Sequence, residues 1–444
     1  MRGNTDAPAE RDTIFALATA SGRAGVAMVR VSGPLAEAGI RHLTGREAPS
    51  ERKAEIRTLF DPSTNDRIDT GLALFFRGPR SYTGENVAEF QMHGGKAVQA
   101  ALLAALGKLR GFRPAEPGEF TRRAVENGRL DLTQAEAIAD LVSAETDAQR
   151  RLALRQHDGA LAELYEGWRS RLIRAAAWIE ASLDFADEEI PADAAARSRQ
   201  EIGAVLAEIE AHLNDGRRGE IMREGLQVAV IGPPNAGKSS LINALARRDV
   251  AIVSDQPGTT RDVIEVHLDL GGYAVILADT AGLRESADGI EQEGVRRARA
   301  RADSADLRIL VLDGAAENVG ASNLDLPNAD ITVCNKADIA TRKTKAGFWV
   351  SAKTGEGLAE LVAMLSKEAA GRVSGGEAPV LTRARYRHAL EEAAQSLAAV
   401  SDTKEAELVA EHIRLALRAI GRITGRVDLD ELLDVVFRDF CIGK

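Results

Sequence analysis

The sequence has few cysteines, few aromatic residues and no long apolar run. Its 444 residues include only two cysteines, Cys334 and Cys441, which excludes a framework of disulfide bonds and a zinc site built on several cysteines. No apolar stretch reaches the length of about 20 residues that a transmembrane helix needs, and the first residues lack the apolar segment of a signal peptide. We therefore expect a cytoplasmic protein with no membrane partner.

Aromatic residues make up 4% of the chain, so its core must consist mainly of Ala, Leu, Val and Ile. The hydrophobic fraction of 45% is ample for packed cores, and the length predicts roughly two to four domains. The formal net charge is −10, which argues against a general electrostatic attraction to nucleic acid. Any contact with RNA would therefore use a local basic patch.

Changes in pattern along the chain predict four segments. The first is a mixture of strands and helix, the second and fourth are helical, and the third alternates strands and helices as in a mostly parallel sheet with helices on both faces. We expect the two helical segments to form one bundle, with the third segment inserted between them. The predicted boundaries are 1–120, 121–215, 216–375 and 376–444.

Apolar runs bounded by turn residues predict the strands of both sheets, and helical spacing predicts the longer helices. In the first segment the expected strands are 13–18, 25–31 and 71–76, followed by a helix over 96–109. The expected strands of the third segment are 226–231, 274–278, 307–312, 331–334 and 348–350. Helices are expected over 161–185 and 194–213, with a capping box from Thr133 to Glu136 before an earlier helix and a buried stripe containing Trp168 and Trp178.

Two stretches of the first segment are rich in polar residues and glycine, namely 81–86 and 91–95. One interpretation is a pair of turns with a single hydrogen-bonded histidine, His93. The other is a ligand pocket, because glycine lets the backbone pass close to a small molecule. The residues alone leave both interpretations open.

The residues from Gly232 to Ser239 match the phosphate-loop pattern G-x-x-x-x-G-K-[ST] between a predicted strand and a predicted helix. Glycines let backbone N–H groups surround phosphate oxygens, and the N-terminus of the helix adds positive potential. Lys238 is predicted to reach the β- and γ-phosphates, and the Ser239 hydroxyl is predicted to bind Mg²⁺. This stretch therefore predicts a nucleoside triphosphate site.

Two further stretches supply what hydrolysis requires. Asp279 ends an apolar run and can hold Mg²⁺ through water, and Gly282 can donate its backbone N–H to the γ-phosphate. Thr260 lies in a predicted loop and can complete the Mg²⁺ coordination only when the γ-phosphate is present. The loop is therefore predicted to act as a switch.

The base is predicted to be guanine. Asp338 can accept hydrogen bonds from the guanine N1–H and 2-amino group, which adenine does not offer in that arrangement. Asn335 and Lys336 would support the base, and Ser351 and Ala352 would contact the guanine oxygen. Five motifs in this order are far more specific than any one of them.

This set of motifs resembles the TRAFAC class of GTPases. After Asp279-Thr-Ala-Gly stands Leu283, where Ras-like members place a glutamine that orients water. Leucine cannot orient water, so either hydrolysis is slow or another group supplies that function. The nearby acidic candidates are Glu285, Asp288 and Glu291.

Outside the third segment the chain resembles the MnmE (TrmE) family of tRNA-modification GTPases, nearly from end to end. The residues that carry the resemblance are Gly22-Arg-Ala-Gly-Val, Tyr82-Thr-Gly-Glu-Asn, His93-Gly-Gly, Pro117-Gly-Glu-Phe-Thr-Arg, Leu130-Asp-Leu-Thr-Gln-Ala-Glu-Ala-Ile, Asp184-Phe-Ala-Asp-Glu-Glu and the terminal Cys441-Ile-Gly-Lys. The resemblance implies a multidomain α/β plus all-α protein. It would have an N-terminal α+β domain for dimerisation and tetrahydrofolate binding, a helical domain ending in Cys-Ile-Gly-Lys, and an inserted Ras-like GTPase (G) domain.

The resemblance also implies the reaction. Members use a 5-formyl- or 5,10-methylene-tetrahydrofolate as one-carbon donor and work with an FAD-dependent partner, MnmG (GidA). Together they install a carboxymethylaminomethyl or aminomethyl group at C5 of the wobble uridine of certain tRNAs. The implied folate contacts are Arg30, Glu85, Arg129 and Lys444, and Cys441 is a candidate for chemistry.

K⁺ activates the GTPase of this family when two G domains of the homodimer meet, so that GTP hydrolysis drives the cycle. By resemblance Asn235, Ser254, Gln256 and Thr259 would hold the ion, in place of an arginine finger. Glu291 matches the acid that activates water, so the implied catalytic group is Lys238, Thr260, Gly282 and Glu291. The whole predicted GTP site comprises Asn235, Ala236, Gly237, Lys238, Ser239, Ser240, Ser254, Asp255, Gln256, Pro257, Gly258, Thr259, Thr260, Asp279, Thr280, Ala281, Gly282, Asn335, Lys336, Ala337, Asp338, Ser351, Ala352 and Lys353.

The main alternative is a ribosome-assembly GTPase, which would share the GTPase motifs. Such a protein would lack the N-terminal segment and the Cys-Ile-Gly-Lys end, and it would usually carry a basic RNA-binding domain that this acidic chain does not show. A membrane-associated transport GTPase is disfavoured because no apolar stretch is long enough to span a membrane.

Overall fold

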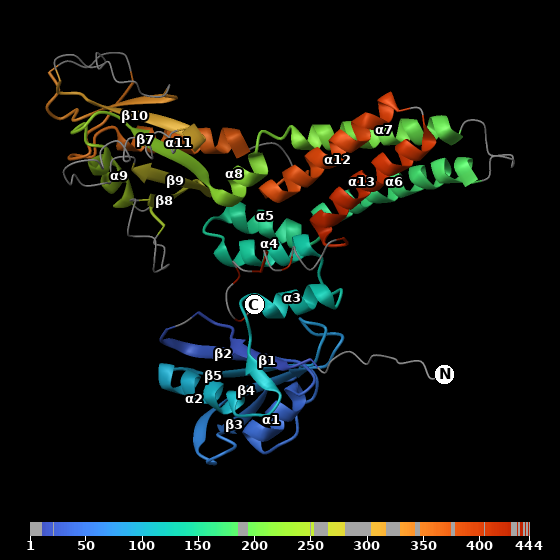
Figure 1. The fold of residues 1–444 in the computed structure, drawn as a ribbon. Helices are drawn as coiled ribbons and strands as arrows, with labels where there is room; N and C mark the ends of the chain where they lie inside the picture. Colours follow the sequence, from blue (N-terminus) through green and yellow to red (C-terminus); the bar gives the residue numbers. More distant parts are fainter. Residues whose placement is uncertain are drawn as a thin grey trace, which may run out of the picture. The chain divides into compact units, whose positions relative to one another are not determined.

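The chain forms two compact units in the computed structural model, each with its own sheet (Figure 1). One unit comprises Met1–Ala139 together with Gly421–Lys444, and the other is Asp140–Ile420. The structure describes residues 11–20, 22–184, 194–248, 250–252, 265–279, 303–316, 329–341, 347–373, 378–403 and 405–427, and the single positions 433, 436, 437, 440 and 443.

The sheet of the first unit has six strands in the order β3-β4-β5-β2-β1-β6. All neighbouring strands are antiparallel except β1 and β6, which are parallel. The strands are β1 Thr13–Leu17, β2 Ala24–Ser32, β3 Glu55–Phe60, β4 Arg67–Phe76, β5 Val87–Gly94 and β6 Phe112–Pro114. The strands predicted at 25–31 and 71–76 are confirmed as parts of β2 and β4, and the strand predicted at 13–18 is confirmed as β1, which ends one residue earlier.

The two faces of this sheet carry different elements (Figure 1). Helices α1 (Ala36–Thr44) and α2 (Lys96–Gly107) bury Ile40 and Leu102 in the same core as Val29 and Val31 of β2. Because strand side chains alternate between faces, the intervening Arg30 and its neighbour Ser32 lie on the opposite face. That face also holds a small cluster with Phe120 of α3 (Glu119–Glu126).

The last part of the chain packs within the first unit. Phe437 and Phe440 join a core cluster with Leu132, at the start of α4 (Leu132–Ser143). Gly443, with φ of +101°, lies so close to β1 that a Cβ there would be 2.2 Å from the Leu17 carbonyl oxygen. Only glycine allows this approach, so the backbone next to the final residue is held against the end of β1.

The start of α4 corrects the predicted capping box. Asp131 caps the helix, because its Oδ1 accepts from the backbone N–H groups of Thr133 and Gln134 at 2.7 and 3.0 Å. The Gln134 side-chain oxygen in turn accepts a hydrogen bond from the Asp131 N–H at 3.1 Å. The box therefore starts two residues earlier than predicted, since aspartate caps as well as threonine does. Thr133 is inside the helix and donates to Asp131.

The second unit contains a helical region. Its helices come from segments that precede and follow the sheet in the sequence. Arg387 of α12 binds Asp215 at 2.7 Å and Glu220 at 2.9 Å, and Arg199 of α7 donates to the Val400 carbonyl at 2.9 Å. The domain boundaries given above stay a prediction. The helices are α5 Asp147–His157, α6 Ala160–Asp184, α7 Ala194–Leu213, α8 Arg218–Glu224, α12 Ala384–Asp402 and α13 Ala406–Thr424.

The two tryptophans of α6 have different environments. Trp168 is buried, as predicted, and its indole N–H donates to Glu208 at 2.8 Å. Trp178 is 49% exposed, so its predicted place in the core is wrong. The two residues are ten positions apart, which does not bring them back to the same face of a helix with 3.6 residues per turn.

The sheet of the second unit has the order β12-β11-β10-β7-β9-β8 and is parallel except for the β8–β9 pair. Its strands are β7 Leu226–Ile231, β8 Glu265–Leu270, β9 Tyr273–Asp279, β10 Leu307–Asp313, β11 Ile331–Asn335 and β12 Phe348–Trp349. Helices α9 (Lys238–Ala246) and α11 (Leu358–Val373) pack on it. The fold class predicted from the sequence, which comprises an α+β segment, a helical region and a mostly parallel sheet with helices, is the one observed.

Candidate functional site

The phosphate loop follows β7 and ends where α9 begins, as the motif predicts. Gly232 has φ of +147°, and a Cβ there would lie 2.2 Å from the Val311 carbonyl oxygen of β10. Gly237 has φ of +87°, and a Cβ there would lie 2.3 Å from the Asn335 side-chain nitrogen. Both glycines of the motif are therefore required by close approach of other groups as well as by their backbone angles.

Lys238 lies inside this loop and is 7% exposed. Its ammonium group donates to the carbonyl oxygens of Gly232 at 2.9 Å and Pro233 at 3.0 Å. Phosphate oxygens are stronger acceptors than peptide carbonyls for a cation. The lysine is thus positioned where the phosphates of a nucleotide in this loop would be its alternative partners.

Asn335 connects three parts of the candidate site. It ends β11, is 2% exposed, and donates from Nδ2 to the carbonyl oxygens of Ala236 at 3.2 Å and Gly237 at 3.3 Å. Its Oδ1 accepts from the backbone N–H of Lys336 at 2.8 Å and of Ala352 at 3.1 Å. One buried amide therefore joins the end of β11 to the phosphate loop and to the segment at Ala352.

Asp338 and Ser351 form the part of the site predicted to read the base. Ser351 is fully buried, and its hydroxyl donates to Asp338 Oδ1 at 2.7 Å. The ammonium of Lys336 lies 2.6 Å from Asp313 Oδ2. Burial by itself raises the pKa of Asp313, but hydrogen bonds from Lys336 and Ala315 outweigh it and lower that pKa below its usual value.

The described part of the predicted GTP site thus lies at the carboxyl ends of β7, β9, β11 and β12. Asp279 ends β9, and in the parallel pairing it stands opposite Val230, two residues before the phosphate loop. Ala337 and Lys353 lie beside the base-reading residues in the chain, and Ser240 follows Ser239 in α9. The remaining predicted positions lie outside the described residues: Ser254, Asp255, Gln256, Pro257, Gly258, Thr259, Thr260, Thr280, Ala281, Gly282 and Glu291.

A second candidate site lies in the first unit, on the sheet face opposite α1 and α2. Arg30 of β2 pairs with Glu89 of β5 at 3.0 Å, and its guanidinium carbon is 4.9 Å from the centre of the Tyr82 ring. The Tyr82 hydroxyl is 2.6 Å from the Thr121 hydroxyl of α3. Burial raises the pKa of Tyr82 above its usual value, so the ring carries a neutral hydroxyl at physiological pH.

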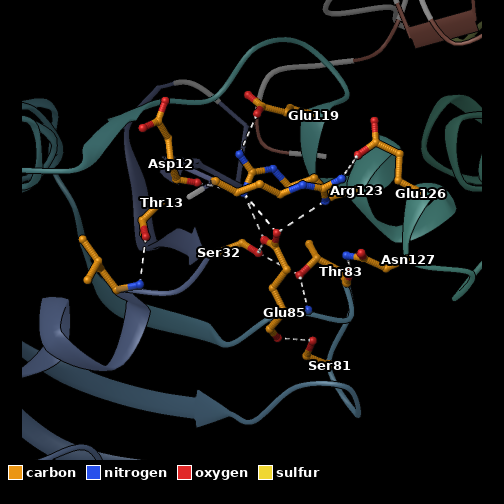
Figure 2. A network of polar contacts seen from close by, with 12 residues as sticks. Asp12, Thr13, Ser32, Ser81, Thr83, Glu85, Glu119, Arg123, Glu126 and Asn127 are labelled. Carbon is orange, nitrogen blue, oxygen red and sulfur yellow. Dashed lines mark hydrogen bonds and ion pairs between the residues drawn. The ribbon is translucent and has the colours of Figure 1, made fainter. Parts of the chain in front are cut away.

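Glu85 and Arg129 approach the same face. The Glu85 carboxylate accepts a hydrogen bond from the Ser32 hydroxyl at 2.8 Å, and Ser32 is two residues along β2 from Arg30 (Figure 2). Gly84, with φ of +80°, lies so near Arg129 that a Cβ there would be 3.2 Å from Arg129 Cγ. Three of the four residues named for folate binding therefore gather around residues 81–86; Lys444 and Cys441 lie outside the described residues.

His93 lies on a strand and not in a turn, where one of the two interpretations placed it. Residues 91–94 form the end of β5 and not a turn, because Phe90 and Met92 alternate into the core while Gln91 and His93 face away. His93 is in contact with Asp69 of β4, with 3.0 Å between its Nδ1 and Asp69 Oδ1. The interpretation with one hydrogen-bonded histidine holds for this residue.

The sequence did not reveal Arg123 and Ser32 as parts of this second site. Arg123 is 5% exposed, and it donates to Glu85 Oε2 at 3.0 Å and to Glu119 Oε1 at 2.9 Å. The only signal was the spacing of four residues between Glu119 and Arg123 on one helix.

In the parts of the chain that the structure describes, no cluster of three metal-binding side chains is present. Among the described helices, none combines the length and apolar character needed to cross a membrane.

Two family models match most of the chain between them. Residues 132–441 match the family model of the MnmE helical domain, and residues 13–129 match the model of the GTP-binding protein TrmE N-terminus. Among solved structures, the G domain of the T. maritima FeoB iron transporter is 29% identical over 32% of this chain and 98% of its own, with a TM-score of 0.25, which is too low to support a conclusion.

Two curated relatives are similar over nearly their full length. The tRNA modification GTPase MnmE of Parvibaculum lavamentivorans is 56% identical over 98% of this chain and 100% of its own length. The protein of the same name from Paramagnetospirillum magneticum is 54% identical over the same shares. From these matches we conclude that the chain belongs to the MnmE (TrmE) family of tRNA modification GTPases.

Proposed function

We propose that this chain binds and hydrolyses GTP as part of the modification of a wobble uridine in tRNA. The observation that carries the nucleotide half of the proposal is Asn335, whose buried amide ties the phosphate loop to the segment predicted to read guanine. The family membership carries the tRNA half, because the relatives that match end to end are named tRNA modification GTPases. The ribosome-assembly alternative gains no support from these matches.

The residues at the phosphate loop fit a nucleotide with Mg²⁺. Gly232 and Gly237 leave no room for a side chain, and Lys238 is the first residue of α9, directly after Gly237. We assign Mg²⁺ to the hydroxyls of Ser239 and Thr260 and, through water, to Asp279, since Mg²⁺ prefers oxygen ligands. Bound there, the ion would neutralise charge on the β- and γ-phosphates.

A K⁺ site at the phosphate loop would account for the missing glutamine at Leu283. Asn235 has φ of +59°, an unusual angle for a residue other than glycine, and it lies in the middle of the loop. We assign K⁺ to Asn235 with Ser254, Gln256 and Thr259, and we assign the activation of water to Glu291. Hydrolysis would then require that two G domains of a homodimer meet, so that the ion and the water are both enclosed.

The one-carbon donor belongs to the second site. Arg30, Glu85 and Arg129 offer two cations and one carboxylate around one loop, which suits a ligand with carboxylates and with N–H donors, as a tetrahydrofolate has. A 5-formyl or 5,10-methylene form would supply the carbon that an FAD-dependent partner of the MnmG (GidA) type transfers to C5 of uridine. Lys444 is assigned as the fourth contact, and Gly443 beside β1 places the backbone before it next to this sheet.

The nucleotide half is tested by measuring GTP hydrolysis of the full chain in K⁺ and in Na⁺ at equal ionic strength. We expect hydrolysis to be much slower in Na⁺, because the ion site is built for the larger cation. The variant Asn235→Ala should remove the difference between the two salts while GTP binding persists. Equal rates for the wild-type chain in both salts would contradict the K⁺ assignment but not the binding of GTP.

A further inference from the structure

The Glu85 carboxylate has partners from three other segments, one of which is Arg11, whose Nη1 lies 3.8 Å from Oε1. Ser32, at the end of β2, donates its hydroxyl at 2.8 Å, and Arg123 of α3 donates from Nη1 to both carboxylate oxygens at 3.0 and 3.3 Å. Glu85 itself is in the loop between β4 and β5. Figure 2 shows the dashed lines that join the Glu85 carboxylate to Arg123 and to Ser32.

Arg123 cannot easily move away from this position. It is 5% exposed, and the same Nη1 that reaches Glu85 also donates to the Asp12 carbonyl oxygen at 2.9 Å. Its Nη2 donates to Glu119 Oε1 at 2.9 Å. The planar guanidinium is therefore fixed by three acceptors from three segments, and a fixed guanidinium fixes the carboxylate that it binds.

Glu119 is held in turn by a second arginine. Arg113 donates from Nη1 and Nη2 to the two oxygens of Glu119 at 2.8 and 2.6 Å. Burial alone raises the pKa of Glu119, but the hydrogen bonds from Arg113, from the Glu116 backbone and from Arg123 lower it below its usual value. Two arginines and two carboxylates thus alternate as Arg113, Glu119, Arg123 and Glu85, and each buried charge has a partner of opposite sign.

Only one of the two arginines touches Glu85. Arg113 binds Glu119, Asp12 and the carbonyl oxygen of Pro114, and none of its described contacts is with Glu85. Arg123 binds Glu119 as well, but it continues to Glu85. Both arginines bind Glu119, but only Arg123 also binds Glu85. A substitution of Arg113 is therefore a matched control for the same substitution of Arg123.

We propose that Arg123, assisted by Ser32, is a positioning residue that fixes the orientation of the Glu85 carboxylate for ligand binding. The inference rests on the folate site proposed above. A carboxylate has only acceptor oxygens, so Glu85 recognises N–H donors of the ligand, such as those of the amino-pyrimidinone edge of a pterin. Arg123 acts through Glu85 and needs no contact with the ligand.

The test is calorimetric binding of 5-formyltetrahydrofolate to the full chain. Lysine retains the charge but cannot reach several acceptors at once, so Arg123→Lys should weaken binding about tenfold. The matched control Arg113→Lys should leave the affinity within about twofold. In a Glu85→Gln background Arg123→Lys should have no further effect, because the group through which it acts is gone.

Three results would overturn the inference. They are an unchanged affinity in Arg123→Lys, an equal loss in Arg113→Lys, and losses from Arg123→Lys and Glu85→Gln that simply multiply. GTP affinity and circular dichroism report on folding; if Arg123→Lys does not fold, Ser32→Ala decides the question, with an expected loss of about threefold. No binding by the wild-type chain would instead refute the proposed folate site, and with it the role of Arg123.

Discussion

The side-chain nitrogen of Asn335 lies 3.3 Å from the carbonyl oxygen of Gly237, and this contact joins the end of β11 to the phosphate loop. The same amide accepts a hydrogen bond from the Ala352 backbone through its oxygen. The two motifs predicted to bind phosphate and guanine, nearly 100 residues apart in the sequence, therefore form one hydrogen-bonded arrangement. Disturbing it should affect both ends of a bound nucleotide.

The variant Asn335→Asp tests this arrangement. A carboxylate cannot donate to the carbonyl oxygens of Ala236 and Gly237, and it would repel them, so we expect GTP and GDP to bind at least about tenfold more weakly. Fluorescence titration with a labelled guanine nucleotide measures the affinity. The control Ser366→Ala, which removes a hydrogen bond to Leu270 in the same unit, should change it little. Equal losses in the two variants would argue against a special role for Asn335.

Base specificity is tested by Asp338→Asn. The amide presents a donor where guanine also presents donors, so we expect the preference to move from GTP to xanthosine triphosphate. Competition between the two nucleotides gives the preference directly. Ser351→Ala removes the hydroxyl that holds Asp338 Oδ1 and should weaken GTP binding without creating the new preference. An unchanged preference in Asp338→Asn would contradict the assignment of the base site.

The close approach at Gly232 predicts a loss of stability. A Cβ in Gly232→Ala would meet the Val311 carbonyl oxygen at 2.2 Å at an unfavourable φ, and we expect a loss of about 2 kcal/mol or more in the free energy of unfolding. Gly216→Ala is the control, because Gly216 also has a positive φ but faces open space. Chemical denaturation should show a clearly smaller loss for it, and equal losses would mean that backbone angle alone matters.

His212 predicts that stability depends on pH. Burial lowers the pKa of His212 from 6.5 to about 4, beside Trp168 and Tyr165. The unfolded chain binds the proton more readily, so this contribution is fully present above pH 6.5 and is lost as the pH falls towards 4, by about 3 kcal/mol at most. Denaturation followed by tryptophan fluorescence should show a flatter pH dependence in His212→Gln. The same slope in both proteins would rule out His212 as the source.

Much of the fold could be predicted because its strands are continuous apolar runs. The run at 226–231 is mostly buried on both faces of a parallel sheet, and the run at 307–312 is apolar except for Arg308, so both leave a plain signal in the sequence. The end of β5 is not evident from the sequence, where residues 91–95 suggest either a turn or a ligand pocket, because the polar residues and Gly94 hide the alternation of Phe90 and Met92. Residues 91–94 form a strand because of tertiary packing and not because of local propensity.

Some residues of the two candidate sites could be predicted from local motifs, and others could not. The phosphate loop and the guanine motif are local patterns, so the sequence predicted Lys238 and Asn335 as members of one site, and in the structure Asn335 contacts Gly237, the residue before Lys238. The contact between Arg123 and Glu85 spans 38 residues and depends on how α3 packs against the sheet. No local pattern records such a contact, and only the three-dimensional arrangement makes it visible.

The most direct test of the account is mass spectrometry of the wobble uridine in tRNA from cells that lack this protein. We predict that the carboxymethylaminomethyl or aminomethyl group at C5 is absent, that the wild-type gene restores it, and that a gene encoding Asn335→Asp restores it poorly. Fully modified wobble uridine in the deleted strain would contradict the proposed function.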